Sequence, residues 1–171
     1  MRALLATALL VTAPALARET RLPLQSGLQP IERAPRWAFG FMLGDPTGLT
    51  LKRYLGRNAF DAYLGFWAPG LRFGADYLWN LGRLANSPKV ELDIYAGGGG
   101  FAGALSGPCG PGFITCGGGA AYVGARMPLG AELLLKEAPF TFGVEIAPGL
   151  AAGNFGLGFI LDFALIARIL L

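Results

Sequence analysis

The strongest constraint on the fold comes from residues 155–171, FGLGFILDFALIARILL, in which every odd position is apolar. The even positions of this stretch are mixed and include two charged residues, Asp162 and Arg168. Side chains of a β-strand point alternately to the two faces of a sheet, so a period of two predicts a strand with one apolar face. Such a strand suits a soluble sandwich, whose core takes the apolar face, or an outer-membrane barrel, in which that face meets lipid.

The amino-acid composition favours the outer-membrane barrel. The chain is 53% hydrophobic and only 15% charged, and it contains 27 glycines. After the N-terminal segment, no stretch is long enough and free enough of charges and glycines to be a membrane-spanning helix. Apolar residues dispersed with a period of two explain this combination. Only a closed barrel can present such strands to lipid, because it leaves no backbone edge unpaired.

The first residues have the pattern of a secretory signal peptide. Arg2 is a basic start, residues 3–11 are a short apolar run, and residues 15–17 (ALA) fit a cleavage site of small residues. We therefore expect residues 1–17 to be a signal peptide and exclude them from the fold. Residues 18–36 are polar, contain prolines and lack periodicity, which indicates a flexible periplasmic leader.

Alternation recurs along residues 37–171, the expected barrel domain, and divides it into eight strands. Their approximate ranges are 37–44, 49–55, 60–67, 71–80, 90–97, 121–135, 140–147 and 155–171. The longest segment between strands, residues 98–119, is rich in glycine. Pro128 lies within the sixth strand, where its missing N–H group predicts a bulge or a sheet edge. The predicted fold class is all-β, an eight-stranded antiparallel up-and-down transmembrane β-barrel.

Several segments resemble the small, mostly uncharacterised outer-membrane β-barrels of the OmpA-like, eight-stranded kind. The matching pieces are GDPTGLTLKRYL at 44–55, ADYLW at 75–79, GARMPLGAELLL at 124–135 and APFTFGVEIAPGL at 138–150. Together they cover most of residues 44–150, and none of them is catalytic. The resemblance implies a chain that is inserted into outer-membrane lipid by the barrel assembly machinery.

The charged residues of the expected strands fall on one face, which we predict to line the interior of the barrel. They are the cations Lys52, Arg72, Arg126 and Arg168 and the anions Asp61, Asp76, Glu91, Asp93, Glu132, Glu145 and Asp162. Buried charges must be paired, and side chains just fill the interior of an eight-stranded barrel. Glu91 and Asp93 could also be a general acid–base pair, but we interpret them as members of this charge set.

The turn at residues 136–139 predicts the register of the strands on either side of it. Counting outward from its centre places position 126 opposite 149 and position 132 opposite 143. Arg126 can then reach Glu145 only diagonally. The alternative partners that we expect for Arg126 are Asp76 and Asp162.

Several kinds of chemistry are excluded by composition. The chain contains no histidine, which excludes Ser–His and Cys–His nucleophilic sites and the usual zinc ligand sets. A formal net charge of +3 is too weak to indicate nucleic-acid binding. We expect no enzymatic activity, no cofactor, no metal site and a monomeric protein.

The two cysteines, Cys109 and Cys116, lie in the glycine-rich segment of a chain that we expect to be exported. A disulfide is permitted in that compartment. Two thiols without histidine are a poor metal site. We therefore expect a disulfide that closes a short surface loop and contributes about 2.5 kcal/mol by chain entropy.

The functional hypothesis is a bacterial outer-membrane barrel with an ion-paired interior filled by side chains. Its role would be structural or would consist of binding an unknown ligand at the cell surface. The first alternative is a small pore for ions or solutes. The second is a soluble carrier of the lipocalin type, which needs an apolar interior and is disfavoured by the inward charges.

Overall fold

The computed structural model is all-β in the residues that it describes, which are 33–67, 70–105, 120–154 and 156–171. The strands are β1 (Arg36–Asp45), β2 (Thr47–Leu55), β3 (Asn58–Trp67), β4 (Gly70–Asn86), β5 (Val90–Leu105), β6 (Ala120–Arg126), β7 (Leu129–Leu135), β8 (Phe140–Gly153) and β9 (Gly156–Leu170). None of the described segments is a helix long and apolar enough to cross a membrane.

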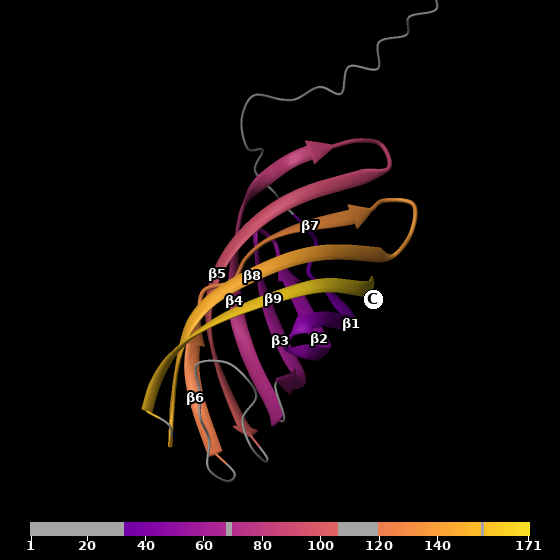
Figure 1. Cartoon of the computed structure of the whole chain (residues 1–171). Coiled ribbons are helices and arrows are strands. Elements are labelled where there is room, and N and C mark those ends of the chain that lie inside the picture. The colour runs from indigo at the N-terminus through magenta and orange to yellow at the C-terminus, as the bar shows by residue number, and fades with distance from the viewer. Residues whose placement is uncertain (1–32, 68–69, 106–119, 155) are drawn as a thin grey trace, which may run out of the picture.

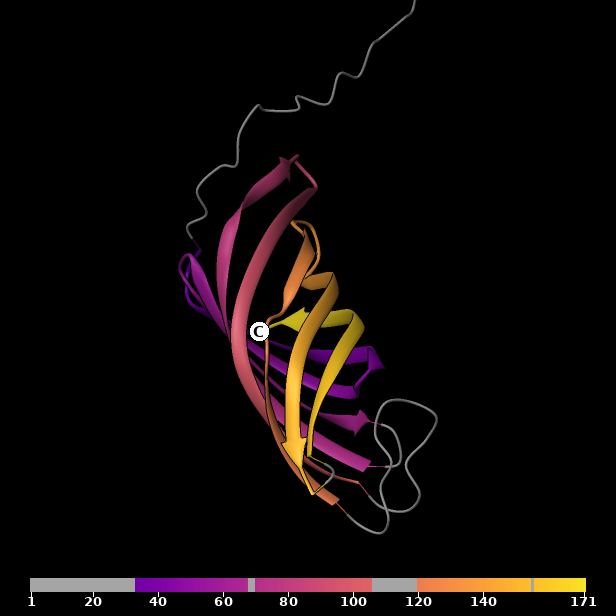
Figure 2. The same ribbon diagram turned by 60° about the vertical axis from the view of Figure 1, so that its left-hand side comes forward.

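All nine strands belong to one antiparallel sheet that closes into a ring (Figures 1 and 2). β6 and β7 both lie between β5 and β8, so they share one position and the ring has eight positions. Each position is filled by the next part of the chain, and pairing of β1 with β9 joins the first strand to the last. The sheet is therefore an up-and-down ring, with the strand count of the predicted fold if β6 and β7 are counted as one.

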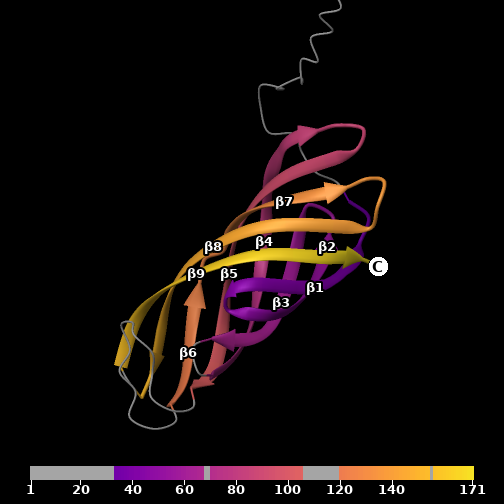
Figure 3. The same cartoon turned by 45° about the vertical axis from the view of Figure 1, so that its right-hand side comes forward.

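The expected sixth strand is interrupted at Met127 and Pro128, as Figure 3 shows for β6 and β7. The residue pairs before and after the gap keep one register against β8, and β5 lies on the other side. Backbone hydrogen bonds run from Gly97 N to the Pro128 carbonyl oxygen at 2.7 Å and from Met127 N to the Pro148 carbonyl oxygen at 2.9 Å. The predicted bulge or edge at Pro128 is therefore wrong, because both neighbours hold the segment across the gap.

Three strands are longer than alternation indicated. β4 continues to Asn86 through the expected connection, β5 continues to Leu105 into the glycine-rich segment, and β8 continues to Gly153. Each extension pairs with a neighbouring strand, so backbone hydrogen bonds sustain it where side chains give no clear pattern. The hairpin of β4 and β5 reaches beyond the other strands, at the top of Figure 1.

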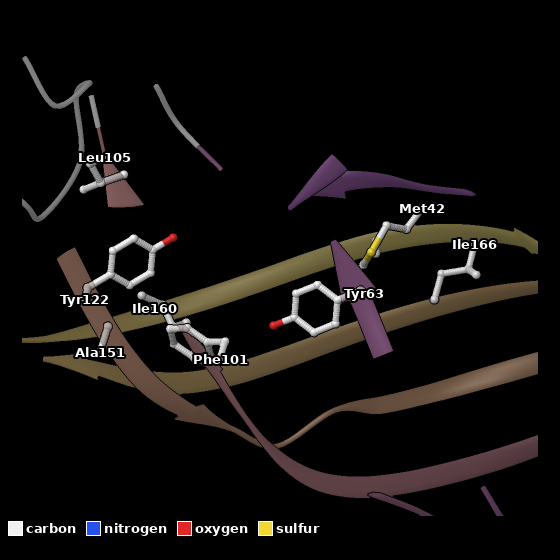
Figure 4. Packing of buried hydrophobic residues seen from close by; sticks show 9 residues of the cluster. Met42, Tyr63, Phe101, Leu105, Tyr122, Ala151, Ile160 and Ile166 are labelled. Carbon is white, nitrogen blue, oxygen red and sulfur yellow. The ribbon is translucent and has the colours of Figure 1, made fainter. Parts of the chain in front are cut away.

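The two faces of the ring differ as the alternation predicted. Along β9, Leu161, Phe163 and Leu165 are exposed on the exterior, whereas Ile160 and Ile166 are buried in the interior. One apolar cluster inside the ring, which Figure 4 shows, consists of Met42, Tyr63, Phe101, Leu105, Tyr122, Ala151, Ile160, Ala164 and Ile166. A second consists of Ala38, Tyr54, Ala59, Leu78 and Tyr95. These clusters fill part of the space between the charged side chains.

Several of the interior aromatic rings lie over glycines of a neighbouring strand. The Cα pairs are Tyr63 with Gly74, Tyr95 with Gly130, Phe101 with Gly124 and Tyr122 with Gly103. A Cβ atom at any of these glycines would overlap the ring that covers it. The glycines thus provide the space that allows large rings inside a narrow closed sheet.

We predict that Gly130→Ala lowers the free energy of unfolding by about 1–3 kcal/mol, because the added methyl group overlaps the Tyr95 ring. The matched control is Gly98→Ala on the exterior, where a Cβ would lie 3.8 Å from the Trp79 ring. It should change the free energy by less than about 0.5 kcal/mol. Urea unfolding in detergent micelles measures both variants, and equal effects would contradict the packing of ring against glycine.

Candidate functional site

The interior contains the charged side chains that alternation placed on the inner face. Ten of the eleven are buried, namely Lys52, Asp61, Arg72, Asp76, Asp93, Arg126, Glu132, Glu145, Asp162 and Arg168. The eleventh, Glu91, keeps 19% of its side-chain exposure. Burying a charge costs several kcal/mol unless it is paired and hydrogen-bonded, so the pairing of these groups determines whether the ring is stable.

A central cluster is formed by Arg72, Asp76, Arg126, Glu145 and Asp162. Arg126 Nε donates to both carboxylate oxygens of Asp76, at 3.2 and 3.1 Å. Its Nη atoms lie 3.2 Å from Glu145 Oε1 and 3.3 Å from Asp162 Oδ2. Arg72 is fully buried and donates to Asp162, with 3.0 Å between Nη1 and Oδ1. Two guanidinium groups thus bind three carboxylates, which come from β4, β8 and β9.

The register predicted for Arg126 is confirmed. Arg126 pairs with Gly149, and Glu132 pairs with Gly143. Glu145 is therefore a diagonal neighbour, and its ion pair with Arg126 spans that diagonal. The alternative partners, Asp76 and Asp162, also bind Arg126, so all three expected carboxylates meet one guanidinium.

A second cluster is formed by Lys52, Asp61, Glu132 and Arg168. Lys52 Nζ lies 2.8 Å from Glu132 Oε2, and the Tyr54 hydroxyl donates to Glu132 Oε1 at 2.8 Å. Arg168 pairs with Asp61 and lies 3.4 Å from Glu132 Oε1. Each carboxylate is therefore bound by at least one cation and one further donor or cation.

The two clusters adjoin at Asp61 and Asp76, and Tyr95 contacts both clusters. Asp61 and Asp76 are Cα partners on β3 and β4, an arrangement in which like charges repel, but each pairs with a different arginine. Thr50 Oγ1 donates to Asp61 Oδ1 at 2.7 Å. The Tyr95 hydroxyl donates to Glu145 Oε2 of the central cluster at 2.9 Å. The Lys52 ammonium of the second cluster lies 4.7 Å from the centroid of the Tyr95 ring.

A third group occupies the end of the ring near the turn between β4 and β5. Asp93 accepts from Arg83 Nε at 2.9 Å and also pairs with Arg33, which precedes β1. Glu91 Oε1 lies 3.3 Å from Lys136 Nζ. Glu91 and Asp93 therefore lie together, as their spacing indicated, but cations bind both of them. This arrangement fits the charge set rather than an acid–base pair.

The sequence pattern missed three cations of this group. Arg33 lies before the first alternating stretch, and Lys136 lies in a turn. Arg83 lies between two register shifts in the pairing of β4 with β5, and the first of these shifts is next to Gly82. Gly82 has a φ of 154°, which side-chain-bearing residues rarely adopt, and the shift turns Arg83 inward after Leu81 faces outward.

These three cations change the charge balance of the interior. The sequence pattern placed four cations and seven anions there. With Arg33, Arg83 and Lys136, the ion pairs among the described residues join seven cations to seven anions. The ion-paired network of these residues is therefore neutral in total.

Two expected features fall on residues that the structure does not describe. The signal peptide, residues 1–17, lies outside the described ranges, and so do Cys109 and Cys116. Within the described ranges, no group of three or more His, Cys, Asp or Glu side chains is placed to hold a metal ion.

Comparisons with known proteins give no relative for this chain. No protein-family model, curated protein or solved structure matches it. Its function must therefore be argued from the chemistry of its own residues.

We predict that Arg126→Ala lowers the free energy of unfolding by about 3–5 kcal/mol, because it leaves buried carboxylates without their partner. The control is Arg57→Ala in the exposed β2–β3 turn, which should change it by less than about 0.5 kcal/mol. Urea unfolding in micelles provides both values. A loss at Arg126 as small as that at Arg57 would contradict the role of the central cluster.

Proposed function

We propose that this chain is an eight-stranded β-barrel of the bacterial outer membrane with a closed, ion-paired interior. Its role is structural or consists of binding a ligand at the cell surface, without catalysis. The single observation that carries the proposal is the reversed polarity of the ring. Large apolar side chains are exposed outside, whereas the charges are buried inside.

Large apolar side chains are exposed on the exterior of eight of the nine described strands. Phe41 on β1, Phe73 on β4 and Leu157 on β9 keep 61%, 58% and 74% of their exposure. Large exposed apolar residues also occur on β2, β3, β6, β7 and β8. Soluble monomers rarely expose contiguous apolar patches beyond a few hundred Å². A belt of this kind supports contact with lipid, in which exposed apolar side chains carry no penalty.

Two shallow grooves on the exterior are also apolar. One, of about 440 Å³, is lined by residues such as Phe41, Leu133 and Leu165. The other, of about 490 Å³, includes Phe73, Ala102 and Val123. Acyl chains of a bilayer are flexible enough to fill grooves of this shape and polarity, which agrees with the proposed location.

The topology supports the resemblance to small OmpA-like barrels. The chain fills eight ring positions in sequence order and closes the first strand on the last. On this proposal, the barrel assembly machinery inserts the chain, outer-membrane lipid surrounds it, and the protein is a monomer. The lipocalin alternative is disfavoured, because a carrier of apolar ligands needs an apolar interior, and here ion pairs occupy it.

We predict that Ile146→Arg lowers the free energy of unfolding in phosphatidylcholine vesicles by about 2–4 kcal/mol, because Ile146 lies midway along β8 on the exterior, where an arginine meets hydrocarbon. Ile146 is 43% exposed, so in a water-soluble ring the same change would cost less than about 0.5 kcal/mol. Leu55→Arg, at the end of β2, is the depth control and should cost only about 0–1 kcal/mol. Equally small losses would contradict a lipid-facing exterior.

Recordings in planar bilayers separate the closed barrel from the pore alternative. Ion pairs and two apolar clusters occupy the interior of the ring, so we predict no steady current from the wild type. Arg126→Ala loosens the central cluster and should produce more frequent openings. Stable single-channel steps from the wild type would contradict the closed interior and favour the pore.

A further inference from the structure

One cation of the described strands points outward, and it stands in a row of aromatic residues. Arg53 on β2 is exposed, and its Cα partners are Trp37 on β1 and Phe60 on β3. Phe60 in turn is the partner of Tyr77 on β4. The Arg53 guanidinium carbon lies 5.0 Å from the centroid of the Trp37 ring. We call these four residues the aromatic row.

A second cation lies next to this row. Arg57 is exposed in the turn between β2 and β3, and its Nε donates to the Asn80 carbonyl oxygen at 3.4 Å. The Tyr77 hydroxyl accepts from Asn58 Nδ2 at 2.8 Å, and the Tyr77 ring packs edge-on against Trp79 with 5.5 Å between centroids. Rings that carry polar atoms, with cations beside them, are typical of the level at which a barrel meets lipid headgroups.

The two cations differ from the arginines of the interior in their partners. Arg72, Arg126 and Arg168 each bind a carboxylate. Within the described ranges, the contacts of Arg53 and Arg57 are a ring and a carbonyl oxygen, both uncharged, and no carboxylate pairs with either. The two guanidinium groups are exposed and are therefore available to an anion from outside the described residues. A planar guanidinium held against a ring is well suited to a phosphate group.

We propose that Arg53 and Arg57, beside the Trp37 ring, bind the phosphate headgroup of an anionic phospholipid. The inference rests on the proposed membrane location. The surface just beyond the row suits the rest of such a molecule. Phe39 and Leu51 are Cα partners two residues farther along β1 and β2, and both are exposed on the exterior. In the proposed location they lie between the row and the bilayer centre. A lipid with its phosphate at Arg53 can lay an acyl chain along these two side chains.

The test measures lipid selectivity of the folded protein. The wild type, Arg53→Gln and Lys89→Gln are refolded into phosphatidylcholine vesicles that contain trace spin-labelled phosphatidylglycerol or spin-labelled phosphatidylcholine. The fraction of label immobilised by the protein gives its relative affinity for each lipid. Lys89 is an exposed cation in the β4–β5 turn, at the same end of the ring, so its variant removes an equal charge outside the row.

We expect the wild type to prefer phosphatidylglycerol, Arg53→Gln to reduce this preference about fivefold, and Lys89→Gln to leave it unchanged. Equal reductions in the two variants would overturn the site, because general surface charge would then explain the preference. A wild type that folds into the vesicles without any preference would also overturn it. Heat-modifiable gel mobility monitors insertion separately, so failure to insert would count against the proposed function itself.

Discussion

The structure depends on neutralising charge inside a closed sheet. Arg126 binds carboxylates from β4, β8 and β9, and Arg168 on β9 reaches Asp61 on β3. The pair of Arg126 with Glu145 joins the neighbouring strands β6 and β8. The other pairs cross the interior between strands that are not hydrogen-bonded to each other. The ion pairs therefore connect strands that are not neighbours, whereas backbone hydrogen bonds connect only neighbouring strands. Because unpaired buried charges are costly, such a network favours one arrangement of strands over others.

This constraint also explains the distribution of size and polarity along the strands. Once charges and rings occupy the interior, glycines such as Gly74 and Gly130 have to face the rings, and many of the large apolar residues lie outside. The sequence thus shows 27 glycines together with high hydrophobicity, a combination that a compact soluble core does not require. In the proposed membrane setting, the exterior is stable in lipid, and Arg53 and its aromatic neighbours mark the interface.

Much of the fold follows from local pattern, and the exceptions have identifiable physical causes. The alternation with a period of two predicted which face of each strand is apolar. The turn at residues 136–139 predicted that Arg126 lies opposite Gly149 on β8. β4, β5 and β8 are longer than their alternation indicated, because pairing with neighbouring strands sustains their ends. The sequence of one strand does not reveal that pairing. The bulge beside Gly82 reversed the alternation, so Arg83 could not be assigned to the interior. Arg33 had no periodic context at all, and its role depends on the position of Asp93.

The central claim, that one face of each strand meets lipid and the other does not, can be tested without any substitution. Methyl-labelled protein in lipid nanodiscs would be measured for nuclear Overhauser effects between its methyl groups and acyl-chain methylenes. On β9, exposed Leu161 and Leu165 should show these contacts, whereas buried Ile160 and Ile166 should show none. Contacts that are absent from all four residues, or equally strong at all four, would contradict the account.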